Sequence, residues 1–160
     1  MCKDLHLKYS CTAFDLDSLI FLDKKINIPF FKIASGEIHS LDILNYISIS
    51  KKPIILSTGM ANFNDITKSL KILKKNKKRK ITLLHCVSSY PTNLKDMNLV
   101  RMRNLKNKFK LDVGLSDHSV SFVPAIIAAT NEATVIEKHV TFSKKLNGPD
   151  HKASLDIHQF

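Results

Sequence analysis

The sequence predicts an α/β protein in which parallel strands alternate with helices. Short apolar or β-branched runs recur along the 160 residues, and segments with helical spacing of apolar residues lie between them. The runs begin roughly 20 to 30 residues apart, which is the length of a βα unit with short loops. Strands that are apolar on both faces are typical of a parallel sheet covered by helices. A chain of this length is long enough for one domain with a hydrophobic core.

Six segments are expected to be strands. In chain order they are Lys8–Thr12, Phe30–Ala34, Pro53–Ser57, Ile81–Cys86, Val113–Ser116 and Thr134–Glu137. Three of the segments between them place apolar side chains on one face of a helix. Those positions are Leu16, Leu19 and Ile20, then Ile66, Leu70 and Leu73, then Val123, Ile126, Ile127 and Thr130.

Two parallel architectures are open at this point, a doubly wound sheet and a closed (β/α)8 TIM barrel. A dinucleotide-binding sheet needs a glycine-rich turn after its first strand, and the turn Thr12-Ala13-Phe14-Asp15 contains no glycine. A TIM barrel places functional residues at the C-terminal ends of many strands. Each predicted strand is followed by Ser, Thr, Gly, His or Glu residues. In any single loop, however, such residues are also common in turns that have no functional role. The sequence therefore favours the barrel.

The net charge of +11 has two interpretations. It is typical of proteins that bind nucleic acid or attract an anionic substrate, and it is also typical of Lys-rich solvated helix faces. The densest basic run, residues 74–80, has no interleaved aromatic side chains for stacking on bases. We therefore expect no nucleic-acid partner.

The compartment is expected to be the cytoplasm. The first ten residues lack the apolar segment of a signal peptide, and no apolar run approaches the roughly 20 residues that span a bilayer. Cys2, Cys11 and Cys86 are odd in number and lack metal-type spacing, so no disulfide framework is expected.

His118 and His139 are the strongest candidates for metal ligands. They lie 21 residues apart (139 − 118), which is one βα repeat, so they occupy equivalent points on neighbouring strands about 4.8 Å apart. Two nitrogen ligands are too few for a closed structural zinc site. They suit an open, exchangeable divalent ion completed by water and substrate oxygens. The alternative is that both are ordinary polar residues at loop starts.

A set of basic and hydroxyl side chains is the candidate anion site. Its members are Lys32, Ser35, Ser57, Thr58 and Ser116. Lys32 lies inside an apolar strand, where a charge is costly unless it faces a polar cavity. The alternative for the serines is helix capping. Three residues remain as candidate hydrogen-bonding groups for a polyhydroxylated substrate, with an exposed loop position as the alternative for each: Glu37, Tyr90 and Asp150.

Six motifs, taken together, resemble those of the sialic acid synthase family. They are Lys32-Ile33-Ala34-Ser35-Gly36-Glu37, Pro53-Ile54-Ile55-Leu56-Ser57-Thr58-Gly59-Met60, Leu84-His85-Cys86-Val87-Ser88-Ser89-Tyr90-Pro91-Thr92, Gly114-Leu115-Ser116-Asp117-His118, Ile136-Glu137-Lys138-His139 and Gly148-Pro149-Asp150-His151-Lys152-Ala153-Ser154-Leu155. The resemblance runs from about Tyr9 to the end, in the family's order and spacing. The resemblance implies that residues 1–160 form a partial TIM-barrel catalytic domain, truncated to roughly strands 3–8 of the family's barrel. On this resemblance, the first two βα units and the C-terminal antifreeze-like domain of the family are expected to be absent.

The resemblance also implies the roles of the site residues. His118 and His139 would bind Mn²⁺ or Mg²⁺ and, with Glu37, form the catalytic set. The implied contacts to phosphoenolpyruvate are Thr12, Lys32, Ser35, Ser57 and Ser116, with Ser88 where some members have Asn. The implied contacts to the sugar are Phe14, Glu37, Tyr90 and Asp150.

The implied activity is that of a carbon–carbon bond-forming transferase. It condenses phosphoenolpyruvate with N-acetylmannosamine or a diacetamido analogue, giving a nonulosonic acid and phosphate. The motifs are more similar to sialic or legionaminic acid synthases than to pseudaminic acid ones. The full-length family implies a homodimer, and this shorter chain alone is expected to have little or no activity. Two alternatives stay open: a non-catalytic remnant or split-gene half that needs a complementary chain, and another metal-dependent, phosphoenolpyruvate-using aldolase-type barrel.

Overall fold

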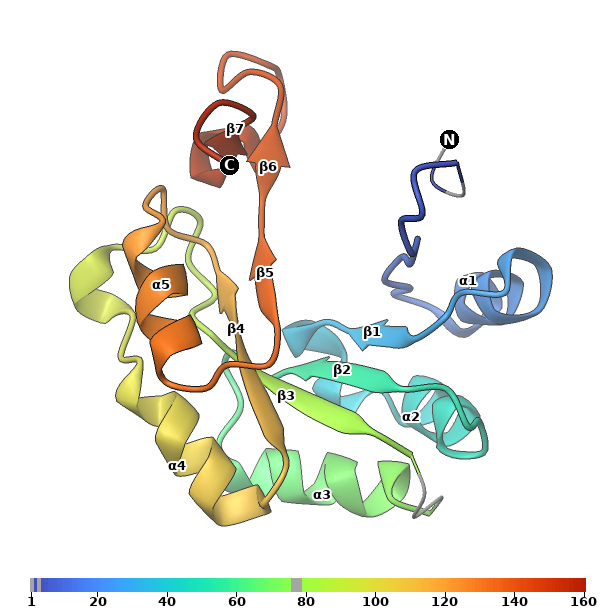
Figure 1. Cartoon of the computed structure of the whole chain (residues 1–160). Coiled ribbons are helices and arrows are strands. Elements are labelled where there is room, and N and C mark those ends of the chain that lie inside the picture. Colours follow the sequence, from blue (N-terminus) through green and yellow to red (C-terminus); the bar gives the residue numbers. More distant parts are fainter. Residues whose placement is uncertain (1, 3, 76–78) are drawn as a thin grey trace. The chain divides into compact units, whose positions relative to one another are not determined.

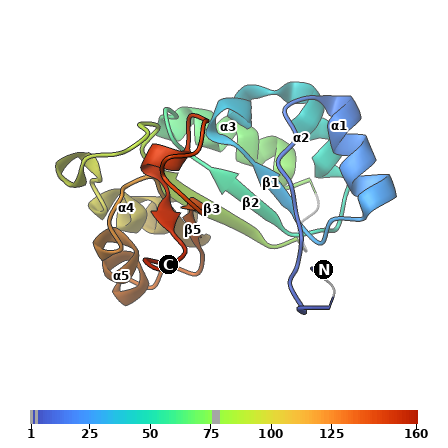
Figure 2. The same ribbon diagram turned by 90° about the horizontal axis from the view of Figure 1, so that it is seen from above.

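The structure is a computed structural model that describes residues 2, 4–75 and 79–160. The chain forms two compact units, Met1–Ile81 and Thr82–Phe160. Each has parallel strands with helices beside them (Figures 1 and 2). Within the described ranges, no helix is both long and apolar enough to cross a membrane.

The first unit contains two strands and their flanking helices. In chain order its elements are α1 (Leu16–Phe21), the π-helix η1 (Leu22–Ile26), β1 (Phe31–Ile33), the 3-10 helix η2 (Ser35–His39), α2 (Leu41–Ser48), β2 (Ile54–Ser57) and α3 (Phe63–Leu73). Strands β1 and β2 are parallel, with Lys32 opposite Ile55. The core includes Phe31, Ile33 and Leu56, all buried. The predicted strands at Phe30–Ala34 and Pro53–Ser57 are therefore confirmed.

Helix α3 begins where its sequence directs. The Asn62 side chain accepts hydrogen bonds from the backbone N–H groups of Asn64 and Asp65, and the Asp65 carboxylate accepts one from the N–H of Asn62. This reciprocal capping box satisfies N–H groups that lack a partner inside the helix. The predicted apolar face is confirmed, since Ile66, Leu70 and Leu73 are all buried.

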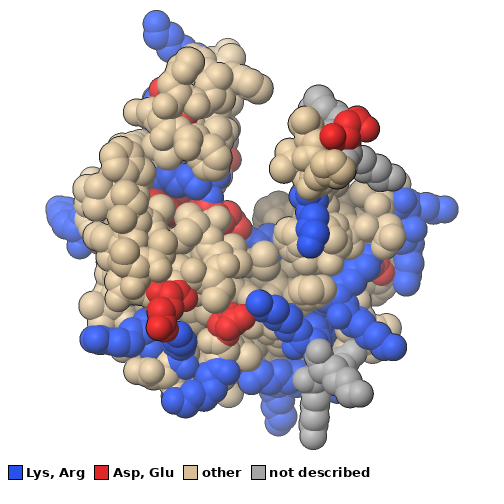
Figure 3. Space-filling model, viewed as in Figure 1, with Lys and Arg blue, Asp and Glu red and all other residues tan. Residues whose placement is uncertain are grey.

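Arg79 is buried rather than part of a basic surface. Its guanidinium donates to the carbonyl oxygens of Ile47 and Ser48, at the end of α2, and to that of Ser50 just beyond. It also donates to the carbonyl of Leu73, the last residue of α3. Carbonyls at helix ends lack intrahelical partners and carry partial negative charge, so a cation stabilises them. Residues 76–78 of the basic run lie outside the described residues. On the face in Figure 3, Lys and Arg lie at several separate positions, with uncharged and acidic residues among them.

The predicted strand at Lys8–Thr12 is wrong. The segment is assigned to no helix or strand, and Tyr9 exposes 52% of its surface. The Ser10 hydroxyl donates to the Phe30 carbonyl at 2.9 Å, which attaches the segment by a side chain rather than by a backbone ladder. A strand exists only where a neighbouring backbone pairs with it, and the residue types alone do not supply that neighbour.

The second unit contains a three-stranded parallel arrangement and a small pair beyond it. Its elements are β3 (Ile81–Cys86), the 3-10 helix η3 (Leu94–Asp96), α4 (Val100–Phe109), β4 (Asp112–Asp117), α5 (Val123–Thr130), β5 (Ile136–Lys138), β6 (Val140–Thr141), the 3-10 helix η4 (His151–Ala153) and β7 (Leu155–Asp156). Strand β4 pairs with both β3 and β5, and β6 pairs with β7. In Figure 1, α4 and α5 lie on one side of β4.

Two of the predicted strands in this unit are confirmed, and the third is displaced. Ile81–Cys86 and Val113–Ser116 match β3 and β4, whereas the predicted Thr134–Glu137 corresponds to β5 at Ile136–Lys138. The Thr134 N–H nevertheless donates to the Val113 carbonyl at 2.9 Å, so pairing with β4 begins before the assigned strand. Differences of one or two residues at element ends are common.

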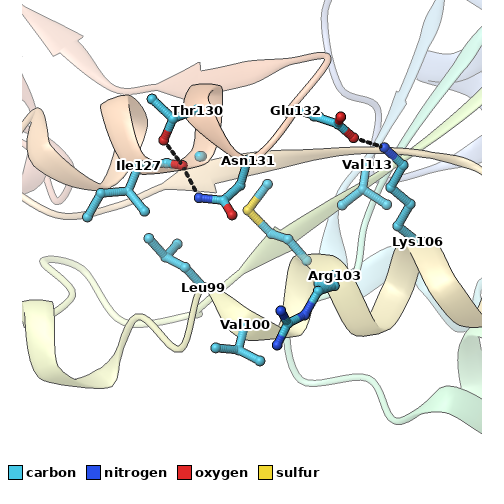
Figure 4. A pocket seen from close by; sticks show the side chains of 11 residues that line it. Leu99, Val100, Arg103, Lys106, Val113, Ile127, Thr130, Asn131 and Glu132 are labelled. Atoms are coloured by element: carbon cyan, nitrogen blue, oxygen red, sulfur yellow. Dashed lines mark hydrogen bonds and ion pairs between the residues drawn. The ribbon is translucent and has the colours of Figure 1, made fainter.

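Helix α5 is confirmed as a helix, but its predicted buried face is wrong. Val123, Ile126 and Ile127 expose 42–55% of their surfaces, whereas Pro124 and Ala128 are buried. Small side chains let a helix approach a sheet closely, and here the bulky ones point elsewhere. Ile127 lines a cavity of about 440 Å³ between α4 and α5, with Leu99 on the other wall (Figure 4).

Candidate functional site

Lys32, Ser35 and Ser57 lie together in the first unit. Lys32 is on β1, and its ammonium donates to the hydroxyl of Ser57, the last residue of β2, at 2.9 Å. Ser35 begins η2, and its hydroxyl accepts from the N–H of Gly59 at 3.0 Å. Ser57 and Thr58 are buried and Lys32 is half-buried. The arrangement offers one cation and two hydroxyls at the C-terminal ends of adjacent parallel strands, a suitable environment for an anion.

Three other predicted residues of this unit lie on different segments. Glu37 is half-buried on η2, where the Ser40 hydroxyl donates to its carboxylate. Thr12 and Phe14 precede α1; Thr12 is half-buried, whereas Phe14 exposes 69% of its surface.

His118 and His139 are neighbours in the second unit. They are the first residues past β4 and β5, whose register pairs Ser116 with Glu137 and Asp117 with Lys138. The centroids of the two imidazole rings are 5.4 Å apart, with an interplanar angle of 73°. The predicted adjacency of the two histidines is therefore present in the structure.

The tautomer of His118 follows from its surroundings. Its Nδ1 lies 2.7 Å from the carbonyl oxygen of Val87, so Nδ1 carries the proton and Nε2 keeps its lone pair. Burial lowers the pKa of His118, although the bond to Val87 opposes the shift, and this favours the neutral ring. The Thr92 N–H donates to the His118 carbonyl at 3.0 Å, so the loop after β3 holds both the side chain and the backbone of this residue.

Ser116 lies between His118 and Glu137. Its hydroxyl is 2.9 Å from Glu137 Oε1 and 3.2 Å from His118 Nε2. A hydroxyl has one proton, and the closer carboxylate is the stronger acceptor, so Ser116 donates to Glu137. The His118 Nε2 lone pair is left available for a metal ion or a substrate proton.

Tyr90 stacks on His118. The ring centroids are 4.0 Å apart at an interplanar angle of 27°, and Tyr90 also meets His139 edge-on at 5.7 Å. Burial is the main cause of the raised pKa of Tyr90, so its hydroxyl remains a hydrogen-bond donor at neutral pH. Asp150 Oδ2 is 3.8 Å from His139 Nδ1. The structure thus groups Tyr90 and Asp150 with the two histidines, whereas Ser88 is exposed on the loop after β3.

The histidine pair is not part of a larger metal cluster. Among the described residues, no group of three or more His, Cys, Asp or Glu side chains is arranged to hold a metal ion. An ion at His118 and His139 would therefore have two protein ligands and open positions for water or substrate.

Three side chains of this unit were not assigned roles from the sequence. Glu137 shares a strand face with His139, and Asp117 and Lys138 form a buried ion pair on the opposite face. The signal for Glu137 was available, because residues i and i+2 of a strand point to the same side. The signal for the cross-strand pair was also available, because Asp117 and Lys138 lie 21 residues apart (138 − 117), as the two histidines do. Its burial and its contacts with the loop after β4 were not predictable from that spacing.

A family model described as NeuB matches residues 1–160. The chain is 46% identical over 156 residues to an N,N'-diacetyllegionaminic acid synthase of Campylobacter jejuni, covering 96% of this chain and 46% of the relative. It is 36% identical over 160 residues to a pseudaminic acid synthase of Helicobacter pylori, covering 100% of this chain and 47% of the relative. The chain spans about half the length of these curated relatives.

A solved structure is also similar. The N-acetylneuraminic acid (sialic acid) synthetase of Leptospira borgpetersenii, crystallised with citrate, matches with a TM-score of 0.91 and 36% identity. The match covers 98% of this chain and 54% of that one. This likeness confirms the predicted fold class, a truncated TIM barrel.

Proposed function

The chain belongs to the NeuB family, and on that premise we propose that it carries residues for condensing phosphoenolpyruvate with an N-acetylated amino sugar. The products are a nonulosonic acid and phosphate. The observation that carries the proposal is the pair of adjacent imidazoles, His118 and His139, with the Nε2 lone pair of His118 available. The names of the relatives, which are legionaminic and pseudaminic acid synthases, support the product class.

The donor set at His118 and His139 fits an exchangeable divalent ion. His118 is held neutral by burial and in one tautomer by Val87, and metal-binding histidines are commonly oriented by such a bond to the second ring nitrogen. A bound Mn²⁺ or Mg²⁺ supplies Lewis-acid polarisation of the sugar's aldehyde oxygen. Tyr90 and Asp150, beside the imidazoles, are proposed to bind hydroxyl groups of the sugar, as is Glu37.

The phosphate group of phosphoenolpyruvate is assigned to Lys32, Ser35 and Ser57. The Lys32 ammonium neutralises charge, while the two hydroxyls fix orientation; the Gly59 N–H donates to the Ser35 hydroxyl and so holds it in place. In the reaction, C3 of phosphoenolpyruvate attacks the aldehyde carbon and leaves a cationic, oxocarbenium-like centre at C2. Water adds at C2, and cleavage of the bond between C2 and the phosphate oxygen releases phosphate. The chain's contribution is positioning and charge stabilisation.

Calorimetric titration tests the metal site directly. We expect saturable binding of Mn²⁺ to the 160-residue chain, strengthened by phosphoenolpyruvate, and loss of that binding in the variant His118→Ala/His139→Ala. The matched control is His39→Ala/His158→Ala, which removes two exposed histidines and should bind as the wild type does. A folded wild-type chain that takes up no Mn²⁺ would refute the metal assignment.

Phosphate release tests the reaction itself. Because the chain spans about half the length of its relatives, we expect little or no release from phosphoenolpyruvate with N-acetylmannosamine or a diacetamido analogue. Full turnover by the isolated chain would contradict this expectation while supporting the chemistry. A sugar that lacks the N-acetyl group separates the proposal from a generic aldolase, because only the latter should accept it.

A further inference from the structure

A buried ion pair lies at the C-terminal ends of β4 and β5. Lys138 Nζ is 2.7 Å from Asp117 Oδ2, and the two side chains expose 5% and 0% of their surfaces. Lys138 Nζ also donates to the carbonyls of Ser119 and Ser121, and Asp117 Oδ1 accepts from the Ser119 N–H at 2.8 Å. Every donor of the ammonium therefore has an acceptor, and both carboxylate oxygens have a donor.

Each partner of this pair immediately precedes one of the two histidines. Asp117 is opposite Lys138 in the strand register, and side chains alternate between the faces of a strand. The ion pair therefore occupies one face while His118 and His139 leave the strands toward the other. On that second face, Ser116 and Glu137 form the neighbouring cross-strand contact, at 2.9 Å. The relative position of the imidazoles is thus linked to the pairing of Asp117 with Lys138.

Stability alone does not account for charges at this place. The desolvation penalty of a buried ion pair can exceed its Coulombic gain, and apolar side chains of similar volume often stabilise a fold equally well. What a hydrogen-bonded ion pair adds is a specific register, and a slip of one residue turns every side chain to the opposite face. Lys138 also fixes the loop at Ser119 and Ser121, which leads into α5.

We propose that Asp117 and Lys138 are positioning residues that hold the imidazoles of His118 and His139 at the separation needed to share one divalent ion. This inference rests on the proposed function, in which the two histidines bind the ion. It assigns Asp117 and Lys138 no contact with the ion or the substrates. Their effect passes through the register of β4 and β5 and through the loop that follows β4.

The test replaces both charged side chains with uncharged ones of similar shape. The variant Asp117→Asn/Lys138→Met removes the ion pair, and Lys106→Met/Glu132→Gln is the matched control. The control removes an exposed ion pair of the same unit, Lys106 Nζ to Glu132 Oε2 at 2.5 Å, with side chains 48% and 79% exposed. We expect the first variant to remain folded by circular dichroism and to bind Mn²⁺ about tenfold more weakly. Tenfold is the low end of the affinity losses seen when residues that orient metal ligands are removed. The control should keep the wild-type affinity.

A second readout needs no metal. Long-range ¹H–¹⁵N correlation spectra of the imidazoles report which ring nitrogen carries the proton. In the wild type His118 should be protonated at Nδ1, because that atom faces the Val87 carbonyl at 2.7 Å. In Asp117→Asn/Lys138→Met we expect a mixture of tautomers, and in the control the wild-type pattern. If the wild type binds no Mn²⁺, the proposed metal site fails, and this spectrum still tests the positioning role.

A folded double variant with wild-type Mn²⁺ affinity and an unchanged His118 spectrum would overturn the inference. If the double variant does not fold, Asp117→Asn alone decides the question. It preserves the shape of the side chain and an acceptor for the Ser119 N–H, and it replaces the charged oxygen that faces Lys138 with a neutral NH₂ group. Weaker Mn²⁺ binding or a mixed His118 tautomer in this variant supports the inference, and a wild-type result in both measurements overturns it.

Discussion

Removal of the Arg79 side chain is predicted to destabilise the first unit strongly. The guanidinium donates to four carbonyl oxygens, those of Ile47, Ser48, Ser50 and Leu73, and it is 8% exposed. Hydrogen bonds to charged groups contribute about 1.5–3 kcal/mol each, but they are not additive, because an alanine also removes the desolvation cost of the cation. For Arg79→Ala we expect a loss of about 3–5 kcal/mol in the free energy of unfolding, because several buried carbonyl oxygens lose this donor at about 1–3 kcal/mol each.

The assay is urea and thermal denaturation followed by circular dichroism. A loss of this size should lower Tm by roughly 6–20 °C for a chain of this length. Arg79→Lys should give an intermediate loss, because one ammonium cannot reach all the carbonyls that the planar guanidinium reaches. Arg103→Ala, at an exposed position of α4, is the control and should change stability by less than about 0.5 kcal/mol. If Arg79→Ala melts within 2 °C of the wild type (roughly 1 kcal/mol or less), the capping argument is wrong.

Two further predictions concern the second unit. Gly114→Ala should reduce the free energy of unfolding by about 3 kcal/mol or prevent folding. The added Cβ would lie 2.2 Å from the Val135 carbonyl oxygen and 2.8 Å from Leu84 Cδ2. Wild-type stability in urea denaturation would contradict this prediction. Burial lowers the pKa of His85, whose Nε2 lies 2.7 Å from the Met97 carbonyl. As the pH falls, the unfolded state binds a proton on this ring first, while the folded state still keeps the ring neutral. The free energy of unfolding should therefore fall as the pH drops below about 6.5, toward the lowered pKa. His85→Gln should show a smaller loss between pH 7.5 and 5.5, and an equal loss in both proteins would count against the assignment.

The sequence located the strand ends well, because their signals are local. Five of the six predicted strands correspond to β1–β5, and only Lys8–Thr12 is not a strand. The repeat length also placed His118 and His139 side by side, because equivalent points on neighbouring parallel strands are adjacent wherever the register holds. The motifs that resemble sialic acid synthases indicated the family, which the match over residues 1–160 shows.

The orientation of individual side chains was less predictable. Apolar periodicity identified α5 but not its buried face, because the face that packs depends on which residues let the helix approach β4. The basic run suggested a solvated surface, whereas Arg79 is buried against the ends of two helices that lie earlier in the chain. Both outcomes depend on contacts between residues far apart in sequence.

The sequence by itself thus determined the alternation of strands and helices, the residues at the strand ends and the adjacency of the two histidines. These properties depend on local periodicity and on the constant spacing of parallel strands. Only the tertiary structure decided that Nε2 of His118 keeps its lone pair and that the ion pair of Asp117 and Lys138 is buried. The reason is physical: a hydrogen-bond acceptor such as the Val87 carbonyl, or a buried counter-charge, is supplied by another part of the chain once the register between strands is set.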